Sequence, residues 1–197
     1  MLAEWVLETA CLQLKRWHAM PGWEDMRIAV NVSARQFRQP GFVRCVHDVI
    51  AAAGIEHARI TLELTESLVL DNVSDAVEKM LALKLLGLRF SMDDFGTGYS
   101  SLSNLKRLPL DELKIDRSFV RDIAAAPGDE VIVRTIIAMG HNLGLTVIAE
   151  GVEQSHQREI LLKYGCDAFQ GYLFGYPFAA AKFETLVIAR RGRYPSL

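Results

Sequence analysis

Hydrophobic residues recur along this chain with two different periods. In three stretches they return every three or four residues, which places them on one face of an α-helix. These predicted helices span residues 3–17, 43–53 and 132–143. The apolar positions that define them are Ala3, Leu7, Ala10, Leu14 and Trp17, then Val43, Val46, Ile50 and Ala53, and then Ile132, Ile136, Met139 and Leu143.

Short apolar runs between the helical stretches predict six strands. Their expected bounds are Arg27–Ser33, Ile60–Thr65, Leu88–Asp93, Glu112–Asp116, Leu145–Glu150 and Ala168–Leu173. Because helical and strand patterns alternate, we expect an α/β fold whose parallel strands are joined by right-handed crossovers. A glycine just after a helix favours a left-handed C-cap, which we predict at Gly54, Gly87, Gly144 and Gly165.

Polar residues lie at or near the C-terminal ends of these runs, opposite the aliphatic side chains. Residues two apart in a strand share a face, so Leu62 and Leu64 lie opposite Glu63. The polar residues found in this way are Asn31, Glu63, Asp93, Lys114, Glu150 and Gln170. Polar groups gathered at one mouth are typical of a TIM-like (β/α) barrel. An open doubly wound sheet is the alternative, but it would bury these groups under helices without a common site.

The predicted barrel is incomplete. A full barrel has eight β/α units, whereas the sequence shows about six strands in 197 residues. The chain starts directly in a helical pattern, so we expect the missing pair to be N-terminal. Either the parent protein is longer, or this barrel lacks two strands.

Composition indicates one globular domain. Twenty-two Lys and Arg against 24 Asp and Glu give a formal charge of −2, which argues against a dedicated DNA-binding protein. Cys11, Cys45 and Cys166 form no C-x-x-C pair and are expected to be free thiols in a reducing cytoplasm. No apolar run reaches the ~18 residues that a membrane span needs. We therefore expect a cytoplasmic chain without membrane contact, ending in a basic tail at residues 189–197.

The polar residues at the strand ends predict a metal site. Carboxylates, an amide oxygen and a lysine in one mouth are costly unless cations neutralise them, and oxygen-only ligands favour Mg²⁺ or Mn²⁺. The adjacent pair Asp93 and Asp94 suits two cations ~3.5–4 Å apart, an arrangement typical of phosphodiester hydrolysis. Each residue also has a structural interpretation: Asn31 as a turn residue, the Asp pair as a loop start, and Lys114 with Glu63 as an ion pair. Their common register at successive strand ends favours one shared site.

At these residues the sequence resembles the EAL-domain family, bacterial phosphodiesterases that hydrolyse cyclic di-GMP to linear pGpG. The resemblance runs in family order from about residue 2 to about residue 186. Its most specific segment is Asp-Asp-Phe-Gly-Thr-Gly at residues 93–98. The other matching segments are Val30-Asn-Val-Ser33, Leu62-Glu-Leu-Thr-Glu-Ser67, Leu113-Lys-Ile-Asp-Arg-Ser-Phe-Val120, Ala149-Glu-Gly-Val-Glu153 and Gln170-Gly-Tyr-Leu-Phe174.

The resemblance implies a role for each residue of the predicted site. It makes Asn31, Glu63, Asp93 and Asp94 ligands of Mg²⁺ or Mn²⁺, places Lys114 and Glu150 around the attacking water, and gives supporting or substrate-binding roles to Asp116, Glu153 and Gln170. Glu66 matches a glutamate that steadies a loop tied to metal binding and dimerisation, which we assign to Ser67–Ser74. The implied domain spans residues 2–188, forms a homodimer and follows a sensory or GGDEF-type domain in its parent protein.

One departure from the family pattern stands out. The Glu-Ala-Leu motif that names the family is absent, because the chain starts at the helix that follows it. The resemblance makes that glutamate a metal ligand, so we expect an N-terminally truncated domain that is a phosphodiesterase in its complete form. The alternatives are a receptor that binds cyclic di-GMP without hydrolysis, a protein-interaction module, or a fragment that completes its barrel by pairing with a second chain.

Overall fold

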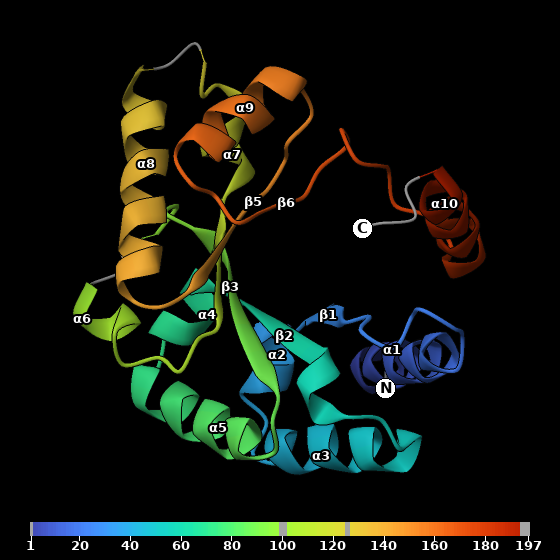
Figure 1. Cartoon of the computed structure of the whole chain (residues 1–197). Helices are drawn as coiled ribbons and strands as arrows, with labels where there is room; N and C mark the ends of the chain where they lie inside the picture. Colours follow the sequence, from blue (N-terminus) through green and yellow to red (C-terminus); the bar gives the residue numbers. More distant parts are fainter. Residues whose placement is uncertain (1, 99–101, 125–126, 194–197) are drawn as a thin grey trace.

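The computed structural model describes residues 2–98, 102–124 and 127–193, which form one curled sheet covered by helices (Figure 1). Six parallel strands lie in sequence order from β1 to β6. The strands are β1 Ile28–Asn31, β2 Ile60–Thr65, β3 Arg89–Phe95, β4 Glu112–Ile115, β5 Thr146–Ala149 and β6 Ala168–Phe169. This half-barrel confirms the predicted α/β class and the six parallel strands.

The helices between successive strands pack on the outer side of the sheet, whereas α1 precedes β1 and α10 follows β6 (Figure 1). In chain order the helices are α1 Leu2–His18, α2 Ala34–Phe37, α3 Phe42–Ala53, the 3₁₀ helix η1 His57–Arg59, α4 Glu66–Leu70, α5 Val73–Leu85, α6 Leu102–Leu105, α7 Arg117–Arg121, α8 Pro127–Asn142, α9 Ser155–Lys163 and α10 Ala180–Arg193. The three helices predicted from hydrophobic spacing correspond to α1, α3 and α8. The short helices α2, α4, α6 and α7 were not predicted, because a single turn is too short to show a period.

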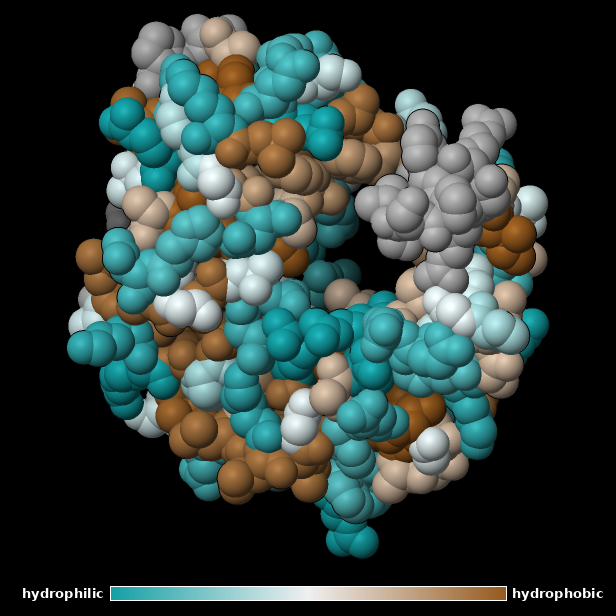
Figure 2. Space-filling view, viewed as in Figure 1, coloured by the Kyte–Doolittle hydropathy of each residue, from teal (hydrophilic) through white to brown (hydrophobic). Residues whose placement is uncertain are grey.

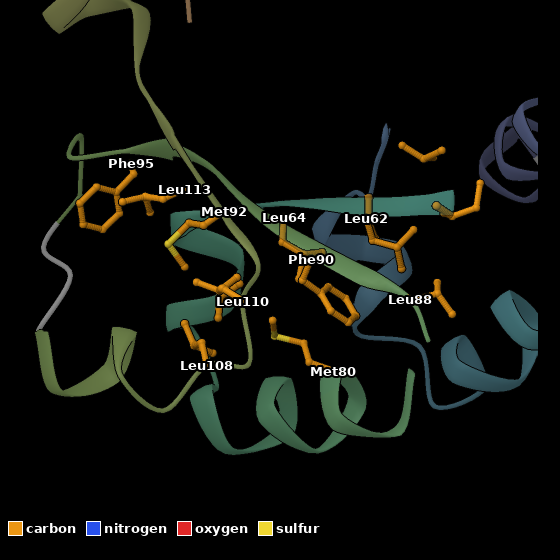
Figure 3. Close-up of a cluster of buried hydrophobic side chains, with 14 of the residues drawn as sticks. Leu62, Leu64, Met80, Leu88, Phe90, Met92, Phe95, Leu108, Leu110 and Leu113 are labelled. Atoms are coloured by element: carbon orange, nitrogen blue, oxygen red, sulfur yellow. The ribbon is translucent and has the colours of Figure 1, made fainter. Parts of the chain in front are cut away.

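The core lies between the outer face of the sheet and the helices. Leu62, Leu64, Phe90 and Met92 are buried on this face and form one cluster with Met80 of α5 (Figure 3). The alternate residues of the same strands face the concave side, as the period of two predicts. In the view of Figure 2 a hollow lies near the centre of the molecule, and hydrophilic residues border part of it.

The helix ends follow the predicted glycines. Gly54, Gly87, Gly144 and Gly165 all have positive φ angles between 66° and 98°. This left-handed backbone lets the chain leave each helix and turn toward the next element. The predicted left-handed glycines at these helix ends are therefore confirmed; Gly54 is the C-cap of α3, whereas Gly87 and Gly165 directly follow the C-cap residues Leu86 and Tyr164.

Only β2 keeps its predicted bounds; β1, β4 and β5 are shorter by one or two residues at one or both ends, and β3 and β6 differ more. The strand predicted over Ala168–Leu173 ends at Phe169, because the backbone after it turns toward the loop that follows β5. There Val152 accepts a hydrogen bond from the amide of Leu173 at 3.0 Å. By contrast, β3 continues beyond its predicted end at Asp93 and shifts register between Met92 and Phe95.

The first and last helices meet beside the open part of the sheet (Figure 1). The indole of Trp17 in α1 donates a hydrogen bond to Glu184 of α10 at 2.8 Å, and its ring centroid lies 5.3 Å from that of Phe183. Since α10 continues to Arg193, the basic tail predicted at residues 189–197 begins inside a helix, and residues 194–197 lie outside the described part of the chain. Among the residues that the structure describes, no helix is both long and apolar enough to cross a membrane.

Candidate active site

Lys114 lies at the centre of the polar cluster. Its side chain is 3% exposed, and it points from β4 to the concave side of the sheet. The ammonium nitrogen lies 2.9 Å from Glu63 Oε1, 3.2 Å from Asp93 Oδ1 and 2.5 Å from Glu150 Oε1. These carboxylates come from β2, from β3 and from the residue after β5. The structure thus brings four of the predicted site residues into direct contact.

Burial and charge shift the pKa values of this cluster. Burial acts to lower the pKa of Lys114, but its hydrogen bond to Glu150 and the charge of Glu63 outweigh burial and raise the pKa above its usual value. Burial raises the pKa of Glu150, and its contact with Lys114 offsets only part of that effect. Lys114 therefore stays charged, whereas Glu150 takes up a proton more readily than an exposed glutamate.

The irregular end of β3 aims two aspartates at one place. Asp94 has a positive φ of 55° and follows the register shift that begins after Met92. A bulge of this kind rotates a side chain out of the regular alternation. As a result, single carboxylate oxygens of Asp93, Asp94 and Glu150 lie within 4.8 Å of one another. Burial and then the charges of Asp93 and Asp116 raise the pKa of Asp94.

Three converging carboxylates fit a divalent cation. All donor atoms in this group are oxygens, which match Mg²⁺, Mn²⁺ or Ca²⁺ better than zinc. Burial is the main cause of the raised pKa of Asp94, and the negative charges of Asp93 and Asp116 add to it; a bound cation would compensate those charges. The chemistry of the donor set therefore fits a metal site.

Asp116 supports the cluster from the start of α7. Its carboxylate accepts a hydrogen bond from the amide of Ser118 at 2.8 Å and also contacts the Ser118 hydroxyl. Burial acts to raise the pKa of Asp116, but these hydrogen bonds outweigh it and lower the pKa. The ionised side chain caps α7 and faces Asp94. It is thus placed to fix the position of the Asp94 side chain.

Glu66 holds a different loop from the one predicted. Its buried carboxylate accepts a hydrogen bond from the amide of Gly96 at 3.0 Å. Gly98 also lies beside this carboxylate, because a Cβ atom there would be 2.6 Å from Glu66 Oε1. The segment Ser67–Ser74, where the sequence predicted the steadied loop, is mostly helical in α4 and α5. That assignment was wrong, and the loop that Glu66 contacts follows β3.

Three other predicted residues lie outside the contacts of Lys114. Asn31 ends β1 with an exposed side chain and pairs in register with Glu63. Glu153 and Gln170 are exposed and line a small cavity together with Glu150. Arg117 and Tyr172 line the same cavity and were missed by the sequence analysis. Both residues follow the end of a strand, and this position in the sequence could have identified them as candidate site residues.

Comparison with known proteins identifies the family. The model of the "EAL domain" family matches residues 1–177. The bifunctional diguanylate cyclase/cyclic di-GMP phosphodiesterase MucR of Pseudomonas aeruginosa is 43% identical over 94% of this chain and 27% of its own length. The cyclic di-GMP phosphodiesterase NbdA of the same organism is 42% identical over 96% of this chain and 24% of its own length. The chain thus spans about a quarter of the length of these curated relatives.

Solved structures show the same fold. The PaMucR phosphodiesterase in complex with c-di-GMP has a TM-score of 0.89 and 42% identity, covering 92% of this chain and 73% of that chain. The EAL domain of Mycobacterium smegmatis DcpA has a TM-score of 0.89 and 40% identity, covering 95% and 84%. A manganese/cy-diGMP complex of Klebsiella pneumoniae BlrP1 has a TM-score of 0.76 and 31% identity, covering 88% and 44%. The half-barrel with its carboxylate-rich mouth belongs to the EAL domain family.

Proposed function

We propose that this domain hydrolyses one phosphodiester bond of cyclic di-GMP to give linear pGpG. The observation that carries the proposal is the group of carboxylates around Lys114 at the C-terminal ends of β2, β3 and β5. Relatives with 42–43% identity that are named as cyclic di-GMP phosphodiesterases support the choice of substrate.

Mg²⁺ or Mn²⁺ is the proposed cofactor. Asn31, Glu63, Asp93 and Asp94 are the proposed ligands, and Glu150 lies close enough to Asp93 and Asp94 to share a cation with them. The manganese complex of BlrP1 supports this choice of metal. When bound, such cations supply positive charge that activates water and offsets charge on the phosphate.

The side chains of the cluster have distinct proposed tasks. Glu150 accepts the proton of the attacking water, a role that its raised pKa favours. Lys114 holds Glu150 and Asp93 in place through its ammonium group. Asp116 orients Asp94, while Glu66 fixes the backbone at Gly96 just after the two aspartates. Glu153 and Gln170 are proposed to contact the substrate beside this cluster.

The proposed partners are cyclic di-GMP and a second copy of the chain. An apolar groove of about 690 Å³ lies between α6 and α8, lined by residues that include Leu102, Met139 and Leu143. Val131 of α8 is also exposed, and apolar surface of this kind favours association. A GGDEF-type or sensory domain elsewhere in the parent protein is proposed by analogy with the bifunctional MucR. The free thiols Cys11, Cys45 and Cys166 support a reducing, cytoplasmic location.

Chromatography of reaction mixtures tests the proposed activity. The protein is incubated with cyclic di-GMP and increasing Mg²⁺ or Mn²⁺, and pGpG is quantified over time. We expect release of pGpG that requires the cation and stops in EDTA. Binding of cyclic di-GMP without any pGpG would instead identify a receptor.

A further inference from the structure

Ser91 lies in the middle of β3 and is 0% exposed, although it faces the concave side of the sheet. Its direction follows from the strand alternation, because its neighbours Phe90 and Met92 face the helices (Figure 3). The register pairs Ser91 with Glu63 of β2 and with Glu112 of β4. Side chains of the neighbouring strands therefore cover Ser91 completely.

The ion pair between Glu63 and Lys114 crosses β3. In the sheet, β3 lies between β2 and β4, so a side chain of β2 that contacts one of β4 must pass over β3. Glu63 Oε1 and Lys114 Nζ are 2.9 Å apart. Lys114 is two residues beyond Glu112, the register partner of Ser91, and its ammonium also contacts Asp93. The ion pair thus passes over β3 between Ser91 and Asp93.

A second ion pair lies on the other side of Ser91. Arg89 is two residues earlier on the same face of β3, and its guanidinium contacts Glu112 at 3.1 Å. These two side chains are only 26% and 16% exposed, so they fill the space toward the start of the strand. Packing of the outer face against α5 holds the backbone of β3 in place (Figure 3). Atoms added to the Ser91 side chain would therefore extend toward the pair of Glu63 and Lys114.

The hydroxyl group of Ser91 does not explain why a serine stands here. Its oxygen is buried and has no hydrogen-bond partner within the described part of the chain. A buried hydroxyl without a partner costs free energy, so hydrogen bonding gives no advantage over alanine. The small volume of the side chain is the property that leaves room for the ion pair above it.

We infer that Ser91 is a positioning residue, whose small side chain allows Glu63 to reach Lys114 across β3. A larger side chain at this position would push the Glu63 carboxylate away from the ammonium. The ammonium would then hold Asp93 and Glu150 in an altered position, since it contacts both. The catalytic consequence of the inference rests on the proposed function, whereas the contact itself is a property of the metal-free protein.

A double-mutant cycle in the metal-free protein tests the role of the small side chain. The free energy of unfolding is measured with urea in EDTA, with and without Lys114→Met, in the wild type, Ser91→Ala and Ser91→Val. Alanine keeps the space and removes the hydroxyl, whereas valine fills the space. Ala76→Val is the matched control, because Ala76 is 1% exposed in α5 and adds the bulk on the outer side of the sheet.

The valine variant is expected to be coupled to Lys114. Lys114→Met should lower the free energy of unfolding by at most about half as much in Ser91→Val as in the wild type, because valine has already separated the ion pair. It should have its full effect in Ser91→Ala and in Ala76→Val. Ser91→Thr, which has the shape of valine and keeps the hydroxyl, should resemble Ser91→Val.

The same variants are expected to differ in catalysis. In Mn²⁺, Ser91→Val should lower kcat for release of pGpG at least about tenfold and change KM less than about threefold, because a displaced ligand impairs the chemical step more than binding. The conservative variant Ser91→Ala should retain the wild-type kcat. Circular dichroism checks that each variant is folded, and Glu63→Gln replaces Lys114→Met in the cycle if that variant does not fold.

Two outcomes overturn the inference: an equal effect of Lys114→Met in the wild type and in Ser91→Val, or a Ser91→Ala variant that behaves as Ser91→Val does. The two measurements separate this inference from the proposed function. If pGpG forms while the cycle is additive, the positioning role of Ser91 fails and hydrolysis stands. If the cycle shows coupling while the wild type releases no pGpG, the positioning role stands and the proposed hydrolysis fails.

Discussion

The ammonium of Lys114 and the carboxylate of Glu150 approach to 2.5 Å on the concave side of the sheet. This contact ties β4 to the loop after β5. Glu63 and Asp93 contact the same ammonium, so three carboxylates surround one positive charge. The protein thus gathers more negative charge than it neutralises here, which is the arrangement that a cation-dependent site requires.

Replacement of Lys114 by Met should destabilise the metal-free domain. The change removes the shared cation and leaves Glu63, Asp93 and Glu150 without a counter-charge, each only 11–15% exposed. We expect a loss of about 3 kcal/mol in the free energy of unfolding, measured with urea. Mn²⁺ should restore part of the loss, because a cation bound to the folded state stabilises it. Lys106→Met, on the exposed surface, serves as the control.

Asp93→Asn should separate the chemistry of the site from its stability. The change removes one charge from the cluster while preserving the shape of the side chain. We expect Mn²⁺ affinity, measured by calorimetry, to fall at least about tenfold because affinity follows the number of charged ligands. The free energy of unfolding of the metal-free protein should change by less than about 1 kcal/mol. Undiminished Mn²⁺ binding would remove Asp93 from the proposed ligands.

A methyl group at Gly98 should disturb the support that Glu66 provides. The added Cβ would lie 2.6 Å from Glu66 Oε1, which also places it beside the hydrogen bond to Gly96. Gly98→Ala should therefore lower the rate of pGpG release at least about tenfold by shifting the backbone next to Asp94. Gly41→Ala is the matched control, since nothing lies within 4 Å of its Cβ position. Equal rates for the two variants would show that the Glu66 contact has no catalytic consequence.

Asp167 lies at the end of the sheet opposite the carboxylate cluster, and we expect it to make the free energy of unfolding depend on pH. Its carboxylate accepts hydrogen bonds from the amide of Val147 at 2.7 Å and, when His141 donates, from that ring at 2.9 Å. Burial opposes these contacts, yet they outweigh it and lower the pKa of Asp167. Because the pKa of Asp167 is lower in the folded state, its ionised carboxylate stabilises the fold at pH values above the unfolded-state pKa of ~3.9. This stabilisation is lost as the pH falls through the folded-state pKa.

Two substitutions test the contribution of Asp167. Asp167→Asn keeps an oxygen for the Val147 amide, whereas Asp167→Ala removes the acceptor and should cost about 1 kcal/mol more. The stability difference between wild type and Asp167→Asn, measured by urea unfolding from pH 6 to pH 3, should be constant above pH ~4 and shrink below it. A difference that grows toward low pH would contradict the lowered pKa.

The period of two in the strands was enough to predict much of the site. Glu63 and Lys114 alternate with buried leucines and isoleucines, so their common direction follows from the sequence alone. The position of Asp94 does not follow, because the register shift in β3 and the positive φ of Asp94 depend on pairing with β4.

The spacing of hydrophobic and polar residues also could not predict contacts between distant loops. Glu66 and Gly96 are 30 residues apart in the sequence, and hydrophobic spacing carries no information about a carboxylate that bonds to a backbone amide. The early end of β6 likewise depends on Val152, which lies in another loop. The cavity of Arg117 and Tyr172 arises only where three loops meet.

Comparison of pGpG release by the wild type and by Asp93→Asn in Mn²⁺ tests the central claim most directly. We predict that the wild type converts cyclic di-GMP to pGpG and that Asp93→Asn reduces the rate at least about 100-fold. Equal rates in the two proteins, or no pGpG from the folded wild type at any Mn²⁺ concentration, would contradict metal-dependent hydrolysis at this site.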